Sequence, residues 1–216
     1  MNNPEVVPLF PEPVCLYRTN TRDILEELKQ EDWALVKTSS LVGGKGTYMT
    51  RDLYILDKYP DIKEMIMNHF NKFKDEYLGY VHNEFVITTS WGTKTEEGCQ
   101  SAFHDHKNCM FSGVFYVNGG DDCAPLLFKK QPPHSFWIMP DEYNQFNSNT
   151  FNFIPEHQSL IFFPSHLNHR IGMQRNSENR YSIAFNIMPV GTLGFADSHV
   201  DINVNRVSVD PNWNTY

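Results

Sequence analysis

The sequence predicts a mainly β fold, an antiparallel sandwich or jelly roll, braced by a few helices near the N-terminus. From about residue 84 onward, short segments rich in Val, Ile, Phe, Tyr and Thr alternate with Gly, Pro, Asn and Asp, as strands and turns do. No helical pattern interrupts them, which favours antiparallel pairing. The predicted strands are Glu84–Trp91, Ser112–Asn118, Pro125–Lys130, Ser135–Met139, Thr150–Ile154, Ser159–Phe163, Arg170–Met173 and Arg180–Met188.

The predicted helices lie in the first third of the chain. Thr21 is placed to cap a helix over Arg22–Asp32. A second helix is expected from Pro60, a favoured first-turn residue, to about Tyr77. His69 falls on its apolar face and is interpreted as a packed core residue rather than a metal ligand. The face has helical spacing and consists of Ile62, Met65, Ile66, His69, Phe70, Phe73 and Tyr77.

The length of 216 residues, with 40% hydrophobic and 14% aromatic side chains, is typical of one globular domain. We expect that domain to span residues 1–216. Its parts are N-terminal helical support at about 1–80, a jelly-roll core at about 84–190 and a tail at about 191–216. The tail is polar after Asp197 and could extend onto a second copy, so a homo-oligomer is one expectation.

Charge and cysteine content exclude several classes of function. The net charge is -8 and no basic run exceeds Lys129–Lys130, so we expect no non-specific nucleic-acid binding. The four cysteines form no CxxC pair, which favours reduced thiols in a cytoplasmic protein over a cysteine zinc site. Met1–Glu5 lacks the charge of an export signal, and no apolar run approaches about 18 residues, so we expect no membrane association.

Three histidines form the candidate metal site. His104 and His106 are two residues apart, and side chains at that spacing on a strand point to the same side, with Asp105 pointing away. His169 follows a very apolar segment and opens a predicted strand. Neutral imidazole is a good ligand for Fe, Zn, Ni and Cu, and three ligands leave coordination positions open for catalysis.

A polar strand face supplies the second part of the pattern. Arg180, Ser182, Ala184 and Asn186 alternate with four apolar residues, so they share one face of the last predicted strand. A polar face inside a sandwich is unusual unless it lines a cavity. Arg180 presents a planar fork that takes a carboxylate at two points, and Ser182 can donate to the same group.

Together these segments resemble the 2-oxoglutarate/Fe(II)-dependent oxygenase superfamily, and more narrowly a group of small oxygenases of phages and marine bacteria. The similarity covers most of the chain and is densest from Ser90 to Pro189. Each motif is weak alone, whereas their order and spacing are specific. The motifs are Pro8–Val14, His104–His106, Ser112–Val117, Phe162–Ser165 leading to His169, and Arg180-x-Ser182.

The resemblance implies a double-stranded β-helix, a jelly roll related to the cupins, that binds Fe(II) and 2-oxoglutarate and consumes O₂. Its reaction would hydroxylate a C–H bond of a small-molecule or peptide substrate and release succinate and CO₂. His104 and His169 match the two family histidines, and Arg180 with Ser182 matches the pair that holds the distal carboxylate. Tyr116 and Asn186 are further candidates for contact with 2-oxoglutarate. The protein would act in the cytoplasm, that of the host if it is phage-encoded.

His106 departs from the family pattern, which has Asp or Glu at this position. The sequence therefore leaves Asp105 open as the carboxylate ligand, on a bulged strand. It also leaves two other functions open. One is a three-histidine cupin-type dioxygenase that does not use 2-oxoglutarate, although such an enzyme has no need of Arg180-x-Ser182. The other is a non-catalytic jelly-roll module that binds metal or nothing.

Overall fold

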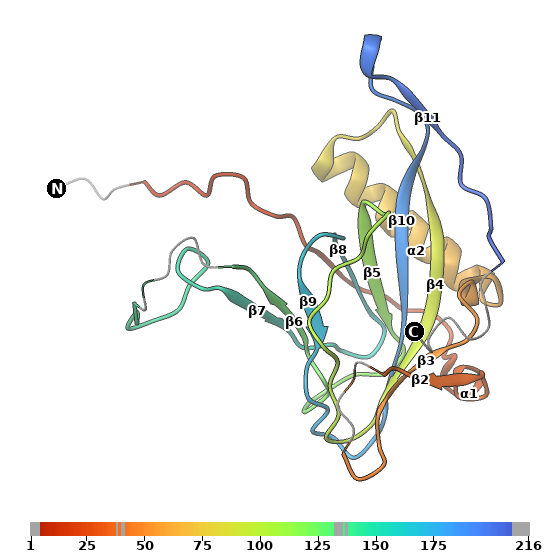
Figure 1. The fold of residues 1–216 in the computed structure, drawn as a ribbon, viewed down its shortest axis with the longest axis vertical. Helices are drawn as coiled ribbons and strands as arrows, with labels where there is room; N and C mark the ends of the chain where they lie inside the picture. The colour runs from red at the N-terminus through yellow and green to blue at the C-terminus, as the bar shows by residue number, and fades with distance from the viewer. Residues whose placement is uncertain (1–4, 38, 40–41, 132–135, 137, 209–216) are drawn as a thin grey trace.

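Two antiparallel β-sheets form the body of the protein in this computed structural model, which describes residues 5–37, 39, 42–131, 136 and 138–208 (Figure 1). The larger sheet has the order β1–β8–β5–β10–β4–β3–β2, with β11 paired to the far end of β10; the smaller has the order β7–β6–β9. This arrangement confirms the predicted mainly β jelly roll. The strands are β1 (Cys15–Arg18), β2 (Trp33–Leu35), β3 (Thr47–Thr50), β4 (Glu84–Thr95), β5 (Phe111–Tyr116), β6 (Leu126–Lys129), β7 (Thr150–Phe153), β8 (Ser159–Pro164), β9 (His169–Ile171), β10 (Arg180–Leu193) and β11 (Val200–Ile202).

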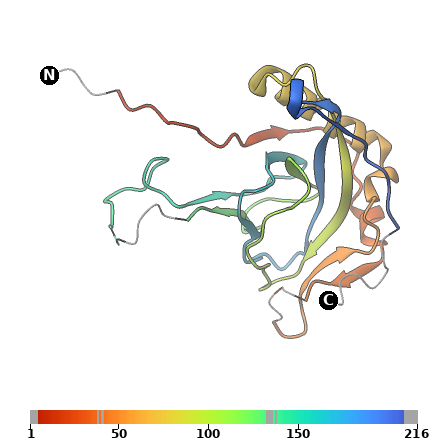
Figure 2. The same cartoon turned by 45° about the horizontal axis from the view of Figure 1, so that its top comes forward.

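Helix α2 covers the outer face of the larger sheet (Figure 2). Its Phe70 is fully buried, and the ring lies 5.4 Å, centroid to centroid, from each of Phe85, Phe111 and Phe162. In the described part of the chain, no helix is long and apolar enough to cross a membrane. The helical elements are α1 (Leu25–Lys29), η1 (Ile55–Asp57), α2 (Pro60–Phe73), η2 (Lys74–Leu78) and η3 (Ala196–Ser198).

The second predicted helix is confirmed as far as Phe73. The chain then forms the wider π turn η2 and ends at Gly79, whose left-handed conformation (φ 70°) is the usual glycine stop after a helix. The turn carries Tyr77 out of the apolar face, so this side chain is 74% exposed. His69 packs edge-on against Tyr17 at 4.6 Å, in agreement with the interpretation of His69 as a core residue.

The first predicted helix is wrong in its extent. Only α1, five residues long, is helical, and Thr21 does not cap it. Instead, an oxygen of Asp23 accepts a hydrogen bond from the Leu25 N–H at 2.8 Å, while the Thr21 hydroxyl bonds to the Arg22 carbonyl. The chain then turns into β2, because the Trp33–Leu35 segment finds an antiparallel partner in β3.

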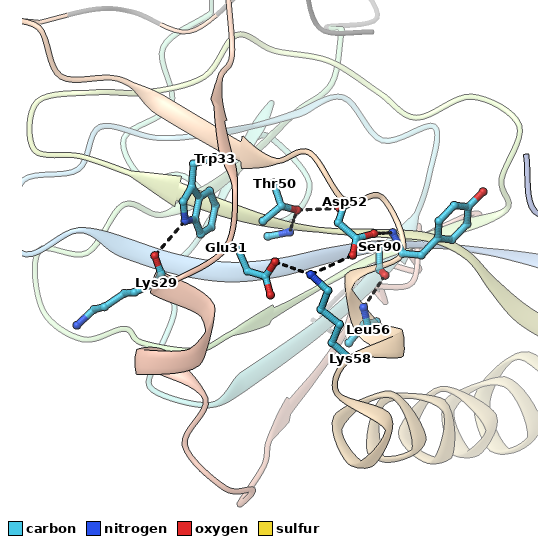
Figure 3. Close-up of polar contacts among 10 residues, drawn as sticks. Lys29, Glu31, Trp33, Thr50, Asp52, Leu56, Lys58 and Ser90 are labelled. Atoms are coloured by element: carbon cyan, nitrogen blue, oxygen red, sulfur yellow. Dashed lines mark hydrogen bonds and ion pairs between the residues drawn. The ribbon is translucent and has the colours of Figure 1, made fainter. Parts of the chain in front are cut away.

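The region predicted as helical support contains three strands, β1, β2 and β3. A side-chain hydrogen bond from β3 reinforces its pairing with β4, and β2 pairs with β3 (Figure 3). The Thr50 hydroxyl accepts from the Gly92 N–H at 2.9 Å and donates to the Asp52 carbonyl at 2.9 Å. The Ser90 hydroxyl accepts from the Leu56 N–H at 3.0 Å and so fixes η1 against the same strand. β3 and β2 therefore extend the larger sheet beside the part of β4 that carries Thr93 and Thr95.

Other boundaries also differ from the predictions. β4 continues to Thr95 and β10 continues to Leu193, where the expectation ended them at Trp91 and Met188. The predicted strand Ser135–Met139 is wrong at Phe136, Ile138 and Met139, which are exposed and belong to no strand; Ser135 and Trp137 lie outside the described residues.

The predicted C-terminal tail folds back and contacts earlier parts of the same chain. β11 pairs with the end of β10, and the Tyr54 hydroxyl bonds to both backbone groups of Val207, at 3.3 Å to the carbonyl and 3.2 Å to the N–H. Arg206 forms an ion pair with Asp57. The described tail therefore contacts η1 and its flanks, and residues 209–216 lie outside the description.

Strand β10 has two buried faces. Tyr181, Ile183, Phe185 and Ile187 belong to the core beneath α2, while Arg180, Ser182 and Ala184 line a pocket between the sheets. The predicted alternation of this strand is therefore confirmed. The pocket face carries the chemistry described below.

We expect the two aromatic residues of the predicted helical face to differ in their effect on stability. Phe70→Ala should lower the free energy of unfolding by about 3–5 kcal/mol, because it empties a fully buried aromatic site. Tyr77→Ala should change it by about 0.5 kcal/mol or less, since the side chain is exposed. Chemical denaturation of both variants measures the difference, and equal losses would contradict the packing described here.

Candidate functional site

Three histidine side chains meet at one end of the pocket. One ligand nitrogen from each of His104, His106 and His169 lies within 4.8 Å of the other two. The ring centroids are 4.6–5.3 Å apart. In the part of the chain that the structure describes, this is the only such group of three His, Cys, Asp or Glu residues. The structure thus brings together the three histidines that the sequence singled out.

Backbone hydrogen bonds hold these histidines in place. His104 and His169 exchange two bonds, N–H to carbonyl, at 2.9 and 2.8 Å, so His104 adds one residue to the edge of the smaller sheet. The N–H of His106 donates to the Ser165 carbonyl at 3.0 Å. The expectation that one strand carries both His104 and His106 is wrong, because only His104 is paired as in a sheet. The chain is nevertheless extended here, and both rings face the pocket.

Each imidazole has a fixed orientation. The Nδ1 of His104 bonds to the Ala102 carbonyl at 3.0 Å, and the Nδ1 of His169 bonds to the Leu167 carbonyl at 2.7 Å. The Nδ1 of His106 bonds to the side-chain oxygen of Asn186 at 2.6 Å. These oxygens only accept hydrogen bonds, so each Nδ1 carries the proton and each Nε2 keeps a lone pair. That tautomer is the one that binds a metal through Nε2.

Burial keeps two of the three histidines uncharged, His106 and His169. His169 is 4% exposed and packs against the rings of Phe163 at 4.8 Å and Phe128 at 6.0 Å. This burial lowers the pKa of His169 to about 3, and burial also lowers the pKa of His106. Both rings are therefore neutral near pH 7, as metal ligation requires.

Asp105 lies outside the histidine group. Its carboxylate bonds to the Lys107 ammonium at 2.7 Å, and this contact lowers the pKa of Asp105. The metal-ligating group in the structure contains no carboxylate among the described residues. Three neutral imidazoles fit Fe(II) and also suit Zn, Ni and Cu.

The pocket extends from the histidines to a buried arginine and has a volume of about 290 Å³. Arg180 is 1% exposed, and its Nε and Nη1 have no hydrogen-bond partner among the described residues. Its guanidinium lies 4.8 Å from the centre of the Tyr116 ring. No acidic side chain of the described chain forms an ion pair with it. A buried and unpaired positive charge is costly, so this end of the pocket is suited to an anion.

Buried hydroxyl groups surround Arg180. In the register of the larger sheet, Thr95 lies opposite Arg180, and Thr47 lies opposite Thr95. Both threonine hydroxyls are buried, and neither has a partner in the described structure. Two residues along each strand, the Ser182 hydroxyl shares a 2.6 Å hydrogen bond with Thr93. Four of these residues, Thr47, Thr93, Arg180 and Ser182, line the pocket, and we call them, with the adjacent Thr95, the polar end of the pocket.

Sequence reasoning found only part of the polar end. Thr93 and Thr95 lie beyond the predicted end of their strand at Trp91, and Thr47 lies between the two predicted helices, where no strand was expected. The signal that was available is the spacing of Thr93 and Thr95, which continues the alternation of β4. Their meeting with Arg180 depends on the pairing of β3, β4 and β10, which is a tertiary feature.

The other two predicted residues have different surroundings. Tyr116 pairs with Ser182 across β5 and β10, and its buried hydroxyl finds no partner in the described chain. Burial raises the pKa of Tyr116, against the opposing charge of Arg180. Asn186 is not among the residues that line the pocket; its amide lies behind His106 and contacts that ring, with Ser112 and Thr89 beside it.

The segment that carries this site matches a known protein family. Residues 89–186, from β4 to β10, match the family described as "Putative 2OG-Fe(II) oxygenase". No curated protein matches the sequence.

Several solved structures share the fold at low sequence identity. An oxidoreductase of the 2OG-Fe(II) oxygenase family from Burkholderia pseudomallei is 12% identical, with a TM-score of 0.53 over 76% of this chain and 75% of that one. HygX from Streptomyces hygroscopicus, solved with nickel and 2-oxoglutarate, is 8% identical, with a TM-score of 0.51 over 82% and 83%. A prolyl hydroxylase from Trichoplax adhaerens, solved with a peptide fragment of hypoxia inducible factor, is 13% identical, with a TM-score of 0.54 over 81% and 83%.

The matched segment carries all three histidines as well as Arg180 and Ser182. The family match and the shared jelly-roll fold confirm the resemblance that the sequence predicted. Residues 89–186 are therefore similar to the 2-oxoglutarate/Fe(II)-dependent oxygenase family, and the chain shares the fold of solved proteins of that kind.

Proposed function

We propose that the protein is a 2-oxoglutarate- and Fe(II)-dependent dioxygenase that hydroxylates a C–H bond of its substrate and releases succinate and CO₂. His104, His106 and His169 would hold the iron, and Arg180 would hold the distal carboxylate of 2-oxoglutarate. The observation that carries the proposal is the buried Arg180, whose unpartnered N–H groups lie in the same pocket as the three histidines.

A ligand that satisfies both ends of the pocket needs a carboxylate at one end and metal-chelating oxygens at the other. 2-Oxoglutarate has both. Its distal carboxylate would accept from Arg180 and from the Thr47 hydroxyl, both of which line the pocket and otherwise have buried groups without a partner in the described chain. Ser182 would contribute through the hydroxyl that it shares with Thr93. HygX, which has the same fold, is known with nickel and 2-oxoglutarate bound.

Fe(II) with 2-oxoglutarate supplies the activation of O₂ that the hydroxylation needs. The chain's own residues bind, orient and exclude water. The three Nε2 atoms present a preformed face of ligands and leave the remaining positions open. Between that face and the polar end the walls are apolar, from side chains such as Trp91, Val114 and Leu126, and they limit the access of water to the reacting groups.

His106 changes the charge of the site. A carboxylate at this position would lower the charge of the bound ion by one, whereas three imidazoles leave it at its full value. Together with Arg180, the pocket then presents three positive charges to a dianion. We expect this to favour the binding of 2-oxoglutarate.

The cupin-type alternative remains the second candidate, because one observation favours it: the metal-ligating group contains no carboxylate among the described residues. Such an enzyme would leave Arg180 buried without an anion, which the structure makes costly. A non-catalytic module would require neither the open side of the histidine group nor the polar end.

The proposal extends to the substrate, the cell compartment and the oligomeric state. A peptide or small-molecule substrate is consistent with the pocket, and the related prolyl hydroxylase is known with a peptide. The cysteines are free thiols, which supports a cytoplasmic protein, in a host cell if the gene is from a phage. Residues 5–14 and 138–149 project on the same side of the sheets and expose Phe10 and Tyr143, which supports a homo-oligomer (Figure 1).

Removal of one histidine tests the metal site. His169→Ala should abolish tight Fe(II) binding, because it removes a buried ligand from a set of three. His166→Ala, which changes an exposed histidine three residues away, serves as the matched control and should bind Fe(II) as the unchanged protein does. Anaerobic titration with metal analysis measures both. Tight Fe(II) binding by His169→Ala would exclude the assigned site.

Replacement of the arginine tests the co-substrate. Arg180→Ala should weaken 2-oxoglutarate binding by about 100-fold or more while Fe(II) binding persists, since a charged hydrogen-bond partner is lost inside the pocket. Thr47→Val should weaken it by a smaller factor of about 2–10, the value of one hydrogen bond. The readout is the weak visible charge-transfer band that forms when 2-oxoglutarate joins the Fe(II) protein without O₂.

The matched control for this experiment is Arg18→Ala, because that side chain is 80% exposed and far along the chain from the pocket. Absence of the band in the unchanged protein would rule out 2-oxoglutarate as co-substrate. An unaltered band in Arg180→Ala would favour the cupin-type enzyme instead.

A further inference from the structure

The three histidines differ in what fixes their rings. His104 and His169 each donate from Nδ1 to a backbone carbonyl two residues earlier in the chain. Backbone carbonyls are present whatever the side chain, so these two anchors are local and cannot be removed by substitution. His106 instead donates to the amide side chain of Asn186, which lies 80 residues further along the chain, on β10. One of the three rings therefore depends on a distant side chain.

Asn186 occupies the middle of a polar row across the larger sheet. In the strand register it lies opposite Thr89 of β4 on one side and opposite Ser112 of β5 on the other. Its amide nitrogen donates to the Thr89 hydroxyl at 3.1 Å, and its oxygen accepts from the Ser112 hydroxyl at 2.9 Å. The row holds the amide from both sides and sets which of its two ends faces His106.

The protons of this network can be assigned one by one. The Asn186 oxygen accepts from His106 Nδ1 at 2.6 Å and from Ser112, so Ser112 uses its only proton there. The Ser112 oxygen lies 3.2 Å from the same Nδ1 and is a second, longer acceptor for its proton. The hydroxyl of Ser165, 3.0 Å away, then donates to Ser112. Ser165 also accepts the N–H of His106 at its carbonyl. The ring and the backbone of His106 are thus fixed by neighbouring groups. In the described chain, no buried side-chain nitrogen or oxygen of Ser112, Ser165 or Asn186 lacks a partner.

The direction of the Asn186 amide decides which nitrogen of His106 is available. With the oxygen toward the ring, Nδ1 carries the proton and Nε2 has the lone pair. If the amide were reversed, its N–H would donate to Nδ1 and the proton would move to Nε2, which could then not bind a metal ion.

We propose that Asn186 is the positioning residue that holds His106 in the metal-binding tautomer. His106 can then serve as the third ligand, at the position where the family has a carboxylate. The proposal rests on the proposed function, because it assigns His106 Nε2 to the metal. It assigns a role to a residue outside the three metal ligands, and that role differs from the contact with 2-oxoglutarate expected of Asn186. The neutral amide also leaves His106 neutral, which preserves the charge of the site.

The first experiment uses the metal-free protein. Nitrogen-15 NMR of the labelled histidines distinguishes the Nδ1–H from the Nε2–H tautomer. His106 should be in the Nδ1–H form in the unchanged protein and in Asn186→Asp, which keeps an oxygen acceptor. In Asn186→Leu, which has no acceptor, His106 should shift toward the Nε2–H form, while His104 and His169 keep theirs. An unchanged tautomer of His106 in Asn186→Leu would overturn the proposal.

The second experiment measures Co(II) affinity by calorimetry and the visible Co(II) spectrum. Asn186→Leu should lose about 10–100-fold in affinity, as loss of a hydrogen-bond partner behind a metal ligand does. Asn186→Asp should restore the affinity and the spectrum, a rescue that a purely structural role would not give. Asn152→Leu, the same change on the exposed face of β7, is the matched control. Asn186→Ala removes the acceptor without adding bulk and replaces the leucine variant if that one does not fold.

The two proposals fail in different ways. If the unchanged protein binds no Co(II) or Fe(II), the proposed function is excluded, and the tautomer comparison still decides the role of Asn186. If the unchanged protein binds Co(II) and a folded Asn186→Leu or Asn186→Ala binds it equally well, the metal site stands and the positioning role is overturned.

Discussion

The two-residue period of β10 is the constraint on which the rest of the structure depends. This strand pairs with β4 on one side and β5 on the other, so both of its faces are buried. One face must be apolar to pack beneath α2, and the other is free to carry polar groups only because a pocket lies over it. Arg180 and Asn186 lie on that second face, six residues or about 20 Å apart along the strand. The two ends of the pocket are therefore set by one rigid element.

The same constraint extends to the neighbouring strands. Because register partners point to the same face, β10 aligns Thr95 with Arg180 at one end and both Thr89 and Ser112 with Asn186 at the other. Rows of polar residues thus cross the sheet at each end, and Ala184 lies between them. If β10 shifted by one residue against β4 and β5, its polar side chains would point into the core and Phe185 would point into the pocket. The apolar core under α2 is therefore what keeps the polar rows in position.

The two polar rows differ in how completely they are satisfied. Around Asn186 every buried side-chain donor and acceptor has a partner, so that end is rigid before any ligand arrives. Around Arg180 several donors have none within the described chain. Unpartnered buried groups cost about 1–3 kcal/mol each, and an anion that pairs with them recovers that cost on binding. Ligand binding should therefore stabilise the fold through the Arg180 end more than through the histidine end.

Local patterns explain what the sequence could predict. Alternation placed Arg180 and Ser182 on one face, and the spacing of His104 and His106 put both rings on one side, although the backbone between them is not a regular strand. The strands of the first 50 residues were missed because three or four residues are too few to show a period. The Thr21 cap was wrong because Asp23, two positions later, binds the free N–H instead.

Contacts between distant segments could not be predicted in this way. Thr47 and Thr95 join Arg180 only when β3 and β10 both pair with β4, and nothing in either segment alone indicates it. Asn186 was grouped with Arg180 because it shares a strand face, and the sequence could not show that His106 lies between it and the pocket.

A histidine at position 106 requires a residue such as Asn186 to fix its tautomer. A carboxylate ligand would need no partner to fix a tautomer, whereas an imidazole has two nitrogens and must be held with the correct one free. A carboxylate behind His106 would hold it equally well but would add a negative charge next to the metal. An amide fixes the tautomer and adds none. The positive charge of the ion is then fully available to a dianionic co-substrate, whose other end meets Arg180 on the same strand. Binding of a dianion between the metal ion and Arg180 is favoured by a high positive charge, and the neutral amide of Asn186 at the other end of β10 preserves that charge.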